Sequence, residues 1–384
     1  MQRTDRFDED TLADAPSPCY VIDELAIEEN CKTLNGVQER TGCRILMALK
    51  GFTIPSLFPM ISKHLHGTCA SGLYEARLGR ERFGKEVHVF APAYDDHEFA
   101  ELLKIADHIV FNSVDQWERH RPLVDGSSRE VSCGIRINPE YSEIPVDLWD
   151  PCARYSRFGV KADDFKGVPD GIEGLHFHAL CQQNSDSLER LIEVVERNFG
   201  RHLSQVKWVN FGGGQLVTAP DYDVDRLCRV ISDFREEHGV DVYMEPGEAV
   251  AYDAGVLLTT VLDIIHNETD VAILDISAWA HVQDVLTCSY KLDVVGGEEA
   301  GKLEHSYRLA SRSCLSGDIL GDFSFERPLQ RGSRIAFSDL ASYSVVSNNM
   351  FNGLPLPAIA ILTKTNEVRI VRRSRYEDYE SRLL

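Results

Sequence analysis

The sequence lacks the features that mark several common classes of protein. Its ten cysteines include no CxxC pair, which argues against a zinc ribbon or a thioredoxin-like redox site. No uninterrupted apolar run approaches the length that spans a membrane, and the polar start MQRTDRFDED has no apolar core of a secretory signal. We therefore expect a cytoplasmic protein with reduced thiols and no membrane partner.

The charge of the chain limits its partners further. A formal net charge of −21 opposes binding to nucleic acid and to anionic membranes. The same charge would steer a polycationic small molecule toward the protein, although solvated acidic helix faces explain it equally well. The hydrophobic content of 43% and the charged content of 26% are ordinary for a globular protein, so we expect a folded core.

Strands and helices alternate along residues 24–248. Strand-like segments are expected at Arg44–Lys50, Gly67–Ser71, Glu86–Ala91, His108–Asn112, Val131–Asn138, Gly174–Leu180, Lys207–Phe211 and Asp241–Glu245. Helical patterns separate them, among them Ile54–Leu65 and Ala162–Val168. This alternation predicts a (β/α)8 barrel. The lack of a GxGxxG motif after a first strand argues against an open doubly wound sheet.

A different pattern begins near residue 249. Further strands are expected at Gly255–Ile265, Val271–Ile276, Ser306–Ala310, Arg334–Phe337, Ala358–Leu362 and Val368–Arg372. Glycine and proline punctuate them, and helical periodicity is nearly lost. We predict a second, all-β domain from residues 249–384, joined by a strand at Pro18–Asp23 from the segment 1–23.

Lys50 closes the alternating stretch RILMALKGF. A lysine at the end of an apolar strand is placed to lose part of its hydration, which lowers the pKa of the amine and suits it to Schiff-base chemistry with a carbonyl cofactor. The alternative is a lysine whose charged end extends into solvent.

Other polar residues and glycines stand at the expected strand ends, where barrel enzymes place their sites. His176 and His178 lie two apart, so we expect both to face the same way. They could bind a metal together with Glu245, stack on a flat cofactor, or pack as core histidines. Gly212–Gly214 follow a strand and suit either a phosphate-binding nest or a tight turn.

Two more residues are candidates for the chemistry. Glu245 closes the eighth expected strand and could hold a pyridine nitrogen protonated, or form a salt bridge or a helix cap. Cys314, in SRSCLSGD, falls between expected strands of the second domain. A small buried hydrophobe is the simpler interpretation of this cysteine.

These residues together resemble the fold-type III pyridoxal-phosphate decarboxylases, which include the ornithine, arginine and diaminopimelate decarboxylases. The carboxynorspermidine/carboxyspermidine decarboxylase branch is the most similar. The matching motifs run in order from residue 18 to residue 353: PCYVID, ILMALKGF, CASGLYEARLG, RYSRFGV, GLHFHALCQQ, WVNFGGG, MEPGEAV, LDISAWAHVQDVL, SCLSGDILGDFSF and SYSVVSNNMFNG.

The resemblance implies a pyridoxal 5'-phosphate site in the barrel. Lys50 would carry the cofactor and His178 would stack on its ring. Gly212, Gly213 and Gly214 would cradle the phosphate. Glu245 would pair with the pyridine nitrogen, and Tyr343 would contact the phosphate.

The resemblance also implies a homodimer with shared active sites. Cys314 would donate a proton across the interface, and Asp318 would face the distal amine of the substrate. Glu248 stands where relatives for basic amino acids place a phosphate-binding arginine, and we expect it to bind substrate ammonium groups instead. His281 would contact substrate or only pack.

The function expected from this resemblance is decarboxylation of carboxynorspermidine or carboxyspermidine to norspermidine or spermidine, with a polycationic substrate and no nucleic-acid partner. A diaminopimelate or other basic amino-acid decarboxylase of the same fold is an alternative. A metal-dependent barrel hydrolase using His176, His178 and Glu245 is an alternative of another class.

Overall fold

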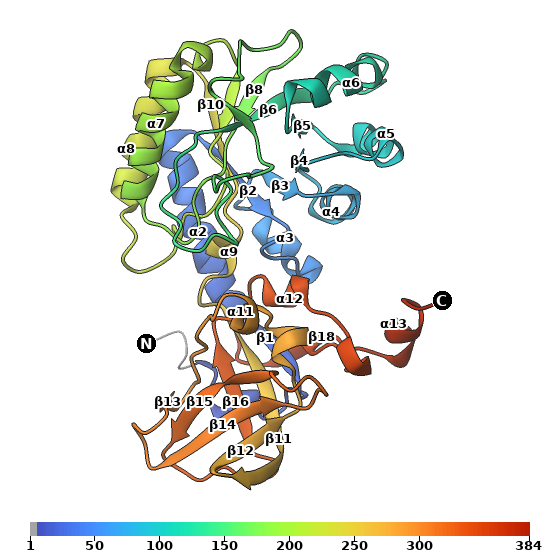
Figure 1. The fold of residues 1–384 in the computed structure, drawn as a ribbon, viewed down its shortest axis with the longest axis vertical. Coiled ribbons are helices and arrows are strands. Elements are labelled where there is room, and N and C mark those ends of the chain that lie inside the picture. The colour runs from blue at the N-terminus through green and yellow to red at the C-terminus, as the bar shows by residue number, and fades with distance from the viewer. Residues whose placement is uncertain (1–5) are drawn as a thin grey trace. The chain divides into compact units, whose positions relative to one another are not determined.

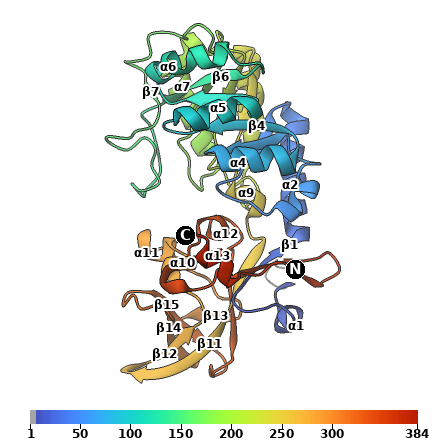
Figure 2. The same ribbon diagram turned by 90° about the vertical axis from the view of Figure 1, so that its right-hand side faces the viewer.

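The computed structural model describes residues 6–384, and its contacts divide the chain into two units. One unit is Glu28–Val250, and the other combines the segment before Glu28 with Ala251–Leu384 (Figures 1 and 2).

The first unit is a closed parallel barrel. Its strands are β2 (Arg44–Ala48), β3 (Gly67–Ala70), β4 (Glu86–Phe90), β5 (His108–Phe111), β6 (Ser132–Asn138), β8 (Gly174–His176), β9 (Trp208–Asn210) and β10 (Asp241–Met244). They pair in the order β5-β4-β3-β2-β10-β9-β8-β6, and pairing of β5 with β6 closes the ring. The short strand β7 (Val160–Lys161) adds to β6. The predicted (β/α)8 barrel is confirmed.

Helices precede, connect and follow the barrel strands. They are α2 (Glu24–Thr41), α3 (Phe58–Ile61), α4 (Leu73–Leu78), α5 (Asp96–Ile105), α6 (Val114–Asp125), α7 (Ser185–Leu203), α8 (Val224–His238) and α9 (Glu248–Ala251). Local signals fix their ends. Asp223 caps α8 by accepting from the N–H of Arg226, and Gly239 ends it in the left-handed conformation.

One predicted helix is shorter and less regular than expected, and a second is wrong. In place of Ile54–Leu65 the chain forms a 3-10 turn, Pro55–Leu57, and the single helical turn of α3. Prolines at 55 and 59 supply no backbone N–H, so they fit only the start of a helix. In place of Ala162–Val168 the N–H of Phe165 reaches the carbonyl of Lys161 at 3.0 Å, but the turn does not continue into a helix.

Trp208 fills the interior of the barrel. Its indole is 3% exposed and donates to Ser132 Oγ at 2.9 Å. Glycines on β6 and β8 make room for the indole. A Cβ on Gly134 would lie 2.4 Å from the ring, and one on Gly174 would lie 2.1 Å from it. With Tyr243 and aliphatic side chains, Trp208 makes the barrel a packed core rather than a pore.

The second unit is built on a mixed sheet. Its strands are β1 (Cys19–Asp23), β11 (Gly255–Asn267), β12 (Thr269–Leu274), β13 (Gly297–Glu299), β14 (His305–Ser311), β15 (Ile319–Phe325), β16 (Arg334–Ser338), β17 (Ala358–Leu362) and β18 (Val368–Arg372). β1 pairs antiparallel with β11 and parallel with β17, which anchors the N-terminal strand at the centre of the sheet.

The unit also contains elements that the sequence pattern does not predict. Strands β13 and β15 are additional, and Gly321 interrupts the apolar pattern of β15 opposite a bulge after Leu309. Short helices are present as well: α1 (Glu9–Leu12), α10 (Ala278–His281), α11 (Asp284–Thr287), α12 (Ser344–Ser347) and α13 (Tyr376–Glu380). The domain is therefore not purely β.

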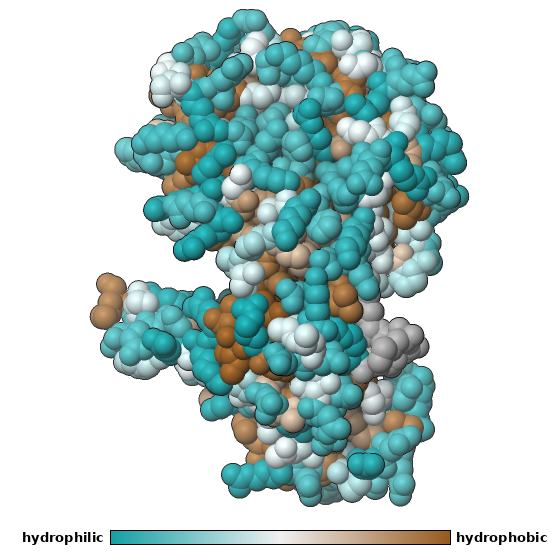
Figure 3. All heavy atoms as spheres, turned by 180° about the vertical axis from the view of Figure 1, so that it is seen from behind, coloured by the Kyte–Doolittle hydropathy of each residue, from teal (hydrophilic) through white to brown (hydrophobic). Residues whose placement is uncertain are grey.

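The surface is largely polar. Hydrophilic side chains cover most of the face drawn in Figure 3. Within residues 6–384, none of the helices combines the length and the apolar character needed to cross a membrane.

Candidate active site

Lys50 lies in the turn that follows β2, not on the strand. The N–H of Gly51 bonds to the carbonyl of Ala48 at 3.0 Å, which closes this turn three residues after the strand ends. The side chain of Lys50 is exposed. The expected alternation therefore stops at Ala48, and the strand is two residues shorter than the expected Arg44–Lys50. The turn presents the amine at the carboxyl end of the barrel.

Glu245 is the centre of a polar cluster at the same end of the barrel. Its carboxylate is 11% exposed, and Oε2 lies 3.5 Å from His176 Nε2. The amide of Asn210 donates to Oε1 at 2.6 Å. Burial favours the neutral acid, but contacts with His176 and a hydrogen bond from Cys69 outweigh it and hold the pKa of Glu245 below its usual range. The site therefore contains a buried carboxylate that stays ionised.

Gly212–Gly214 form a turn that only glycines can make. Gly212 and Gly214 have φ angles of 67° and 92°. A Cβ on Gly213 would lie 2.3 Å from the carbonyl oxygen of Glu245, and one on Gly214 would lie 1.9 Å from that of Leu180. The expected nest is modified, because two of its N–H groups have partners within the chain. Gly212 donates to Asn210 Oδ1 at 2.9 Å and Gly213 donates to His178 Nδ1 at 3.0 Å.

His178 lies beyond the end of β8, which stops at His176. Its Nδ1 accepts the Gly213 N–H, so the neutral ring carries its proton on Nε2. Burial lowers the pKa of His178 well below its usual value, and the cations of Lys50 and Arg136 lower it further. The imidazole is thus a neutral ring fixed against the glycine turn.

The structure does not support the alternative in which His176 and His178 bind a metal. Within the described residues, no grouping of three metal-ligating side chains includes His176 or His178. His176 instead stacks on Phe90, with ring centroids 5.4 Å apart. The described residues therefore do not provide the metal ligands that the hydrolase alternative requires.

Three residues join the site that the sequence did not assign to it. Asn210 bridges Glu245 and Gly212, and Cys69 bonds to Glu245. Arg136 is 4% exposed and donates to the carbonyl of His178 at 3.1 Å. The sequence feature that could have identified them is their position, since all three stand at or near the end of a barrel strand.

Unsatisfied polar atoms at this end of the barrel fit a polar, ring-shaped cofactor. Gln215 directly follows the glycine turn, is 1% exposed, and has no hydrogen-bond partner for either amide atom among the described residues. Nδ1 of His176 is also without a hydrogen-bond partner in residues 6–384, whereas its Nε2 faces Glu245. Buried groups of this kind ordinarily find a partner, so the donor set fits a pyridine ring with an anionic substituent.

Glu248 begins α9 and belongs to the same unit. The amide of Gln182 donates to its Oε1 at 2.6 Å. A carboxylate therefore stands where the resemblance would place an arginine.

Cys314 and Asp318 lie in the second unit, on the loop between β14 and β15. Cys314 is exposed, and its N–H donates to Asn352 Oδ1 at 2.8 Å. The position of the thiol corrects the simple interpretation of Cys314 as a buried hydrophobe. It leaves the sulfur accessible for proton transfer.

Asp318 has a different environment from the one expected. It is 2% exposed, and its carboxylate accepts from Ser277 Oγ at 2.6 Å. It also accepts from Ser311 Oγ at 2.8 Å, from the Trp279 N–H at 3.1 Å and from Ser313 Oγ. Four donors of its own chain fill both oxygens, so Asp318 holds the Cys314 loop rather than offering a free carboxylate to a substrate amine.

His281 and Tyr343 complete the set of predicted residues. His281 is 1% exposed, and its Nδ1 accepts the Ser277 N–H at 3.3 Å, so the packing interpretation is the one its environment favours. Tyr343 precedes α12 with a φ of 47° and is 39% exposed. The structure thus groups Cys314, Asp318, His281 and Tyr343 in one unit, and Lys50, His176, His178, Gly212–Gly214, Glu245 and Glu248 in the other.

Comparison with known proteins connects this geometry to a family. The model of the family described as "Pyridoxal-dependent decarboxylase, C-terminal sheet domain" matches residues 19–341. A carboxynorspermidine/carboxyspermidine decarboxylase from Campylobacter jejuni is 39% identical over 95% of this chain and 98% of its own. A carboxyaminopropylagmatine decarboxylase from Synechocystis sp. is 41% identical over 97% of this chain and 96% of its own.

Solved structures agree with the sequence relatives. The crystal structure of carboxynorspermidine decarboxylase from Campylobacter jejuni complexed with norspermidine superposes with a TM-score of 0.89 at 38% identity. That match covers 95% of this chain and 99% of the other. Diaminopimelate decarboxylase from Helicobacter pylori superposes with a TM-score of 0.80 over 98% of this chain and 100% of its own, but at 16% identity it shows the fold alone.

Proposed function

The chain belongs to the family of pyridoxal-dependent decarboxylases, and we propose that it removes the carboxylate of carboxynorspermidine or carboxyspermidine to give norspermidine or spermidine. The observation that carries the proposal is near-full-length identity of 39% to a decarboxylase of these two compounds. The ionised Glu245, the fixed His178 and the glycine turn at one barrel end support it. Polyamine synthesis is the corresponding process.

The residues at the carboxyl end of the barrel would hold pyridoxal 5'-phosphate. Lys50 would bind its carbonyl group, and His178 would lie against its ring. Glu245 would hold a proton on the pyridine nitrogen, because an ionised buried carboxylate stabilises a neighbouring cation. When bound, the cofactor supplies the electron sink that makes loss of CO2 from the α-carbon feasible. The glycine turn and Gln215 would lie at its phosphate.

The reaction consumes one proton, because the carbon that loses CO2 must regain a hydrogen. We propose that the thiol of Cys314 delivers this proton. Its accessibility and its anchored loop support the role. The resemblance assigns Cys314 to the site of the partner subunit, so the functional form proposed here is a homodimer with shared sites, with Tyr343 contributing to the phosphate.

The substrate carries ammonium groups at a distance from its carboxylate. Glu248 is our candidate for binding one of them, since it is a carboxylate at the start of α9 in place of an arginine. A net charge of −21 would add attraction at long range. With ten unpaired cysteines, we also propose that the protein acts in the cytoplasm.

A second candidate substrate has its own support. The 41% identity to a carboxyaminopropylagmatine decarboxylase favours carboxyaminopropylagmatine, whose far end is a guanidinium rather than an ammonium group. A carboxylate such as Glu248 suits either cation, and a guanidinium pairs with it in two parallel hydrogen bonds.

A substrate panel tests the proposal. Release of CO2 is measured with carboxynorspermidine, carboxyspermidine, carboxyaminopropylagmatine and diaminopimelate. We expect the highest kcat/KM with one of the first two, and a higher value with the third would favour the second candidate. Faster turnover of diaminopimelate than of all three would refute a carboxy-polyamine substrate.

Peptide mapping tests the cofactor site independently. After borohydride reduction, the covalently held cofactor should map to Lys50, and Lys50→Arg should abolish both labelling and activity. Lys63→Arg is the matched control, because Lys63 is an exposed lysine of the same unit. Labelling at another residue would overturn the assignment of Lys50.

A further inference from the structure

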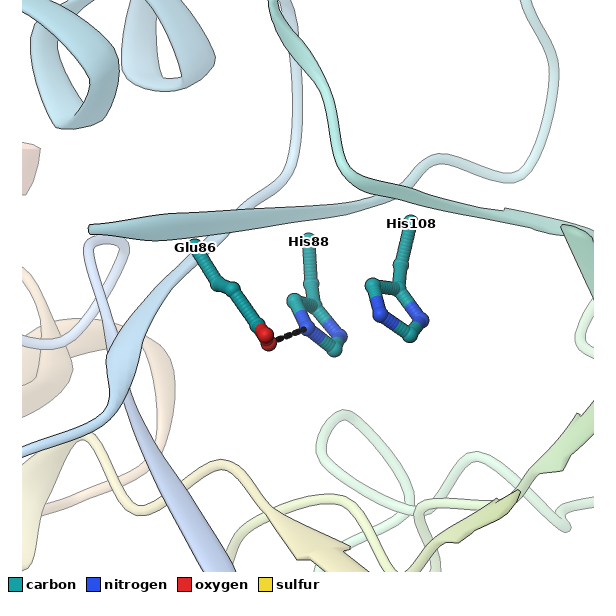
Figure 4. Close-up of side chains that lie close together, drawn as sticks. All are labelled: Glu86, His88 and His108. Atoms are coloured by element: carbon teal, nitrogen blue, oxygen red, sulfur yellow. Dashed lines mark hydrogen bonds and ion pairs between the residues drawn. The ribbon is translucent and has the colours of Figure 1, made fainter. Parts of the chain in front are cut away.

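A second group of titratable side chains occupies the opposite end of the barrel. Glu86 begins β4 and His108 begins β5, and His88 is the third of the five residues of β4. Residues two apart on a strand share a face, and His88 pairs in register with His108. Figure 4 shows all three side chains projecting to the same side of these strands. Each offers one ligand atom, and the three atoms lie within 4.8 Å of one another.

The group is largely buried and incompletely hydrogen-bonded. His88 and His108 are 1% and 9% exposed. Among the described residues, the Nδ1 atom of each has no hydrogen-bond partner. Glu86 Oε2 lies 3.1 Å from His88 Nε2, and Oε1 lies 3.1 Å from Nε2 of His66. Buried ring nitrogens without a partner are costly, so a ligand that accepts their lone pairs would stabilise the fold.

We propose that Glu86, His88 and His108 form a binding site for a divalent transition-metal ion, with Zn²⁺ as the ion that fits the donors best. Two imidazoles and one carboxylate are a ligand set that zinc accepts, with a water molecule in the fourth position. Imidazole donors select against Mg²⁺ and Ca²⁺, which prefer oxygen. This site is separate from the candidate active site, which lies at the other ends of the strands.

The ring geometry says how the ion would bind. The imidazoles of His88 and His108 are stacked 3.9 Å apart with planes 10° from parallel. Nitrogen lone pairs lie in the ring plane, so one ring must rotate about its Cβ–Cγ bond to share an ion with the other. Tyr243 packs against His88 at 4.7 Å, and Trp208 packs against His108 at 5.1 Å. Ion entry is therefore from the side of Glu86, whose carboxylate side chain is 33% exposed.

Titration of the full-length protein with Co²⁺, a spectroscopic substitute for zinc, tests the site. After removal of bound metal with a chelator, we expect one equivalent to bind with the visible absorption of a four-coordinate ion, and Zn²⁺ to displace it. Glu86→Gln keeps the shape of the side chain and removes its charge. This variant and His108→Asn should each weaken Co²⁺ binding at least tenfold.

His266→Asn is the matched control, because His266 is an exposed histidine that also pairs with a carboxylate, Asp270 at 2.8 Å. It should leave binding unchanged. Equal affinity of wild type, Glu86→Gln and His108→Asn would overturn the proposal, as would binding that only His178→Asn abolishes.

Diffraction from the wild-type protein tests the site even if a variant of a buried residue fails to fold. Crystals of the wild-type protein soaked in Co²⁺ should give an anomalous peak at about 2.0–2.2 Å from Glu86 and both histidines. Peaks elsewhere and none at this position would show that the three side chains form only a metal-free stack.

Discussion

Replacing Asp318 should destabilise the loop that carries Cys314. The carboxylate is 2% exposed and accepts four hydrogen bonds, from Ser277, Ser311, Ser313 and the Trp279 N–H. Asp318→Ala removes all four at once. The serine hydroxyls can rotate toward other acceptors, but the Trp279 N–H cannot.

The magnitude follows from these contacts. A hydrogen bond to a charged group contributes roughly 1.5–3 kcal/mol, and partial recovery by the hydroxyls reduces the total, so we expect a loss of about 4 kcal/mol. A change of this size lowers Tm by roughly 10 °C in a unit of this length. Asp318→Asn should cost less, about 1–2 kcal/mol, because its oxygen keeps two donors and its amide can donate to the two remaining hydroxyls.

Thermal unfolding and steady-state kinetics together provide the assay. If Asp318 holds the loop, Asp318→Asn should lower Tm and kcat while KM changes by less than about threefold. Ser313→Ala is the matched control, since it removes one of the same hydrogen bonds and should reproduce a part of the loss. If the carboxylate met a substrate ammonium group, KM would rise on the order of 30- to 100-fold. An unchanged Tm with such an increase would refute the structural role.

Two further predictions concern stability. Burial lowers the pKa of His281 to about 4, although Asp318 opposes the shift, so between pH 6.5 and 4 the unfolded chain binds more protons. Stability should fall by roughly 3 kcal/mol as the pH drops through this window, and urea unfolding of His281→Gln should show a smaller loss. Gly174→Ala should lower Tm strongly, because its Cβ would lie 2.1 Å from Trp208, whereas Gly200→Ala, in open space on a helix, should raise it slightly. Equal melting of both glycine variants would contradict the packing argument.

The barrel could be predicted because its signal is repeated. Each strand is a short apolar run before a helix, and one weak pattern gains support from the others. Isolated elements carry no such support. The helix expected at Ala162–Val168 has apolar residues at suitable spacing, yet Gly167 and Pro169 end it after a turn. Strand β15 was missed for the opposite reason, since Gly321 and Asp322 break its apolar alternation.

The sequence identifies candidate residues for the site, but it predicts their burial and their hydrogen-bond partners less well. Sequence position places Lys50 and Glu245 at the ends of strands, and the barrel then brings them to one end. Period-two alternation gives no indication that β2 stops at Ala48, because the apolar run continues to Leu49. Burial of Asp318 and His281 depends on contacts between segments remote in sequence, which no local pattern encodes.

Asn210 shows what such contacts add to the site. An asparagine two residues before a run of glycines is ordinary turn chemistry, so the sequence gives it no special role. In the structure its amide donates to Glu245 and its oxygen accepts the Gly212 N–H. The Asn210 side chain, which is 0% exposed, therefore fixes the positions of both the Glu245 carboxylate and the first residue of the glycine turn. Because the Glu245 N–H also bonds to the Gly212 carbonyl at 2.7 Å, the two segments are tied at both backbone and side chain. The group proposed to hold the cofactor's ring nitrogen and the turn proposed to hold its phosphate are thus positioned as one rigid unit.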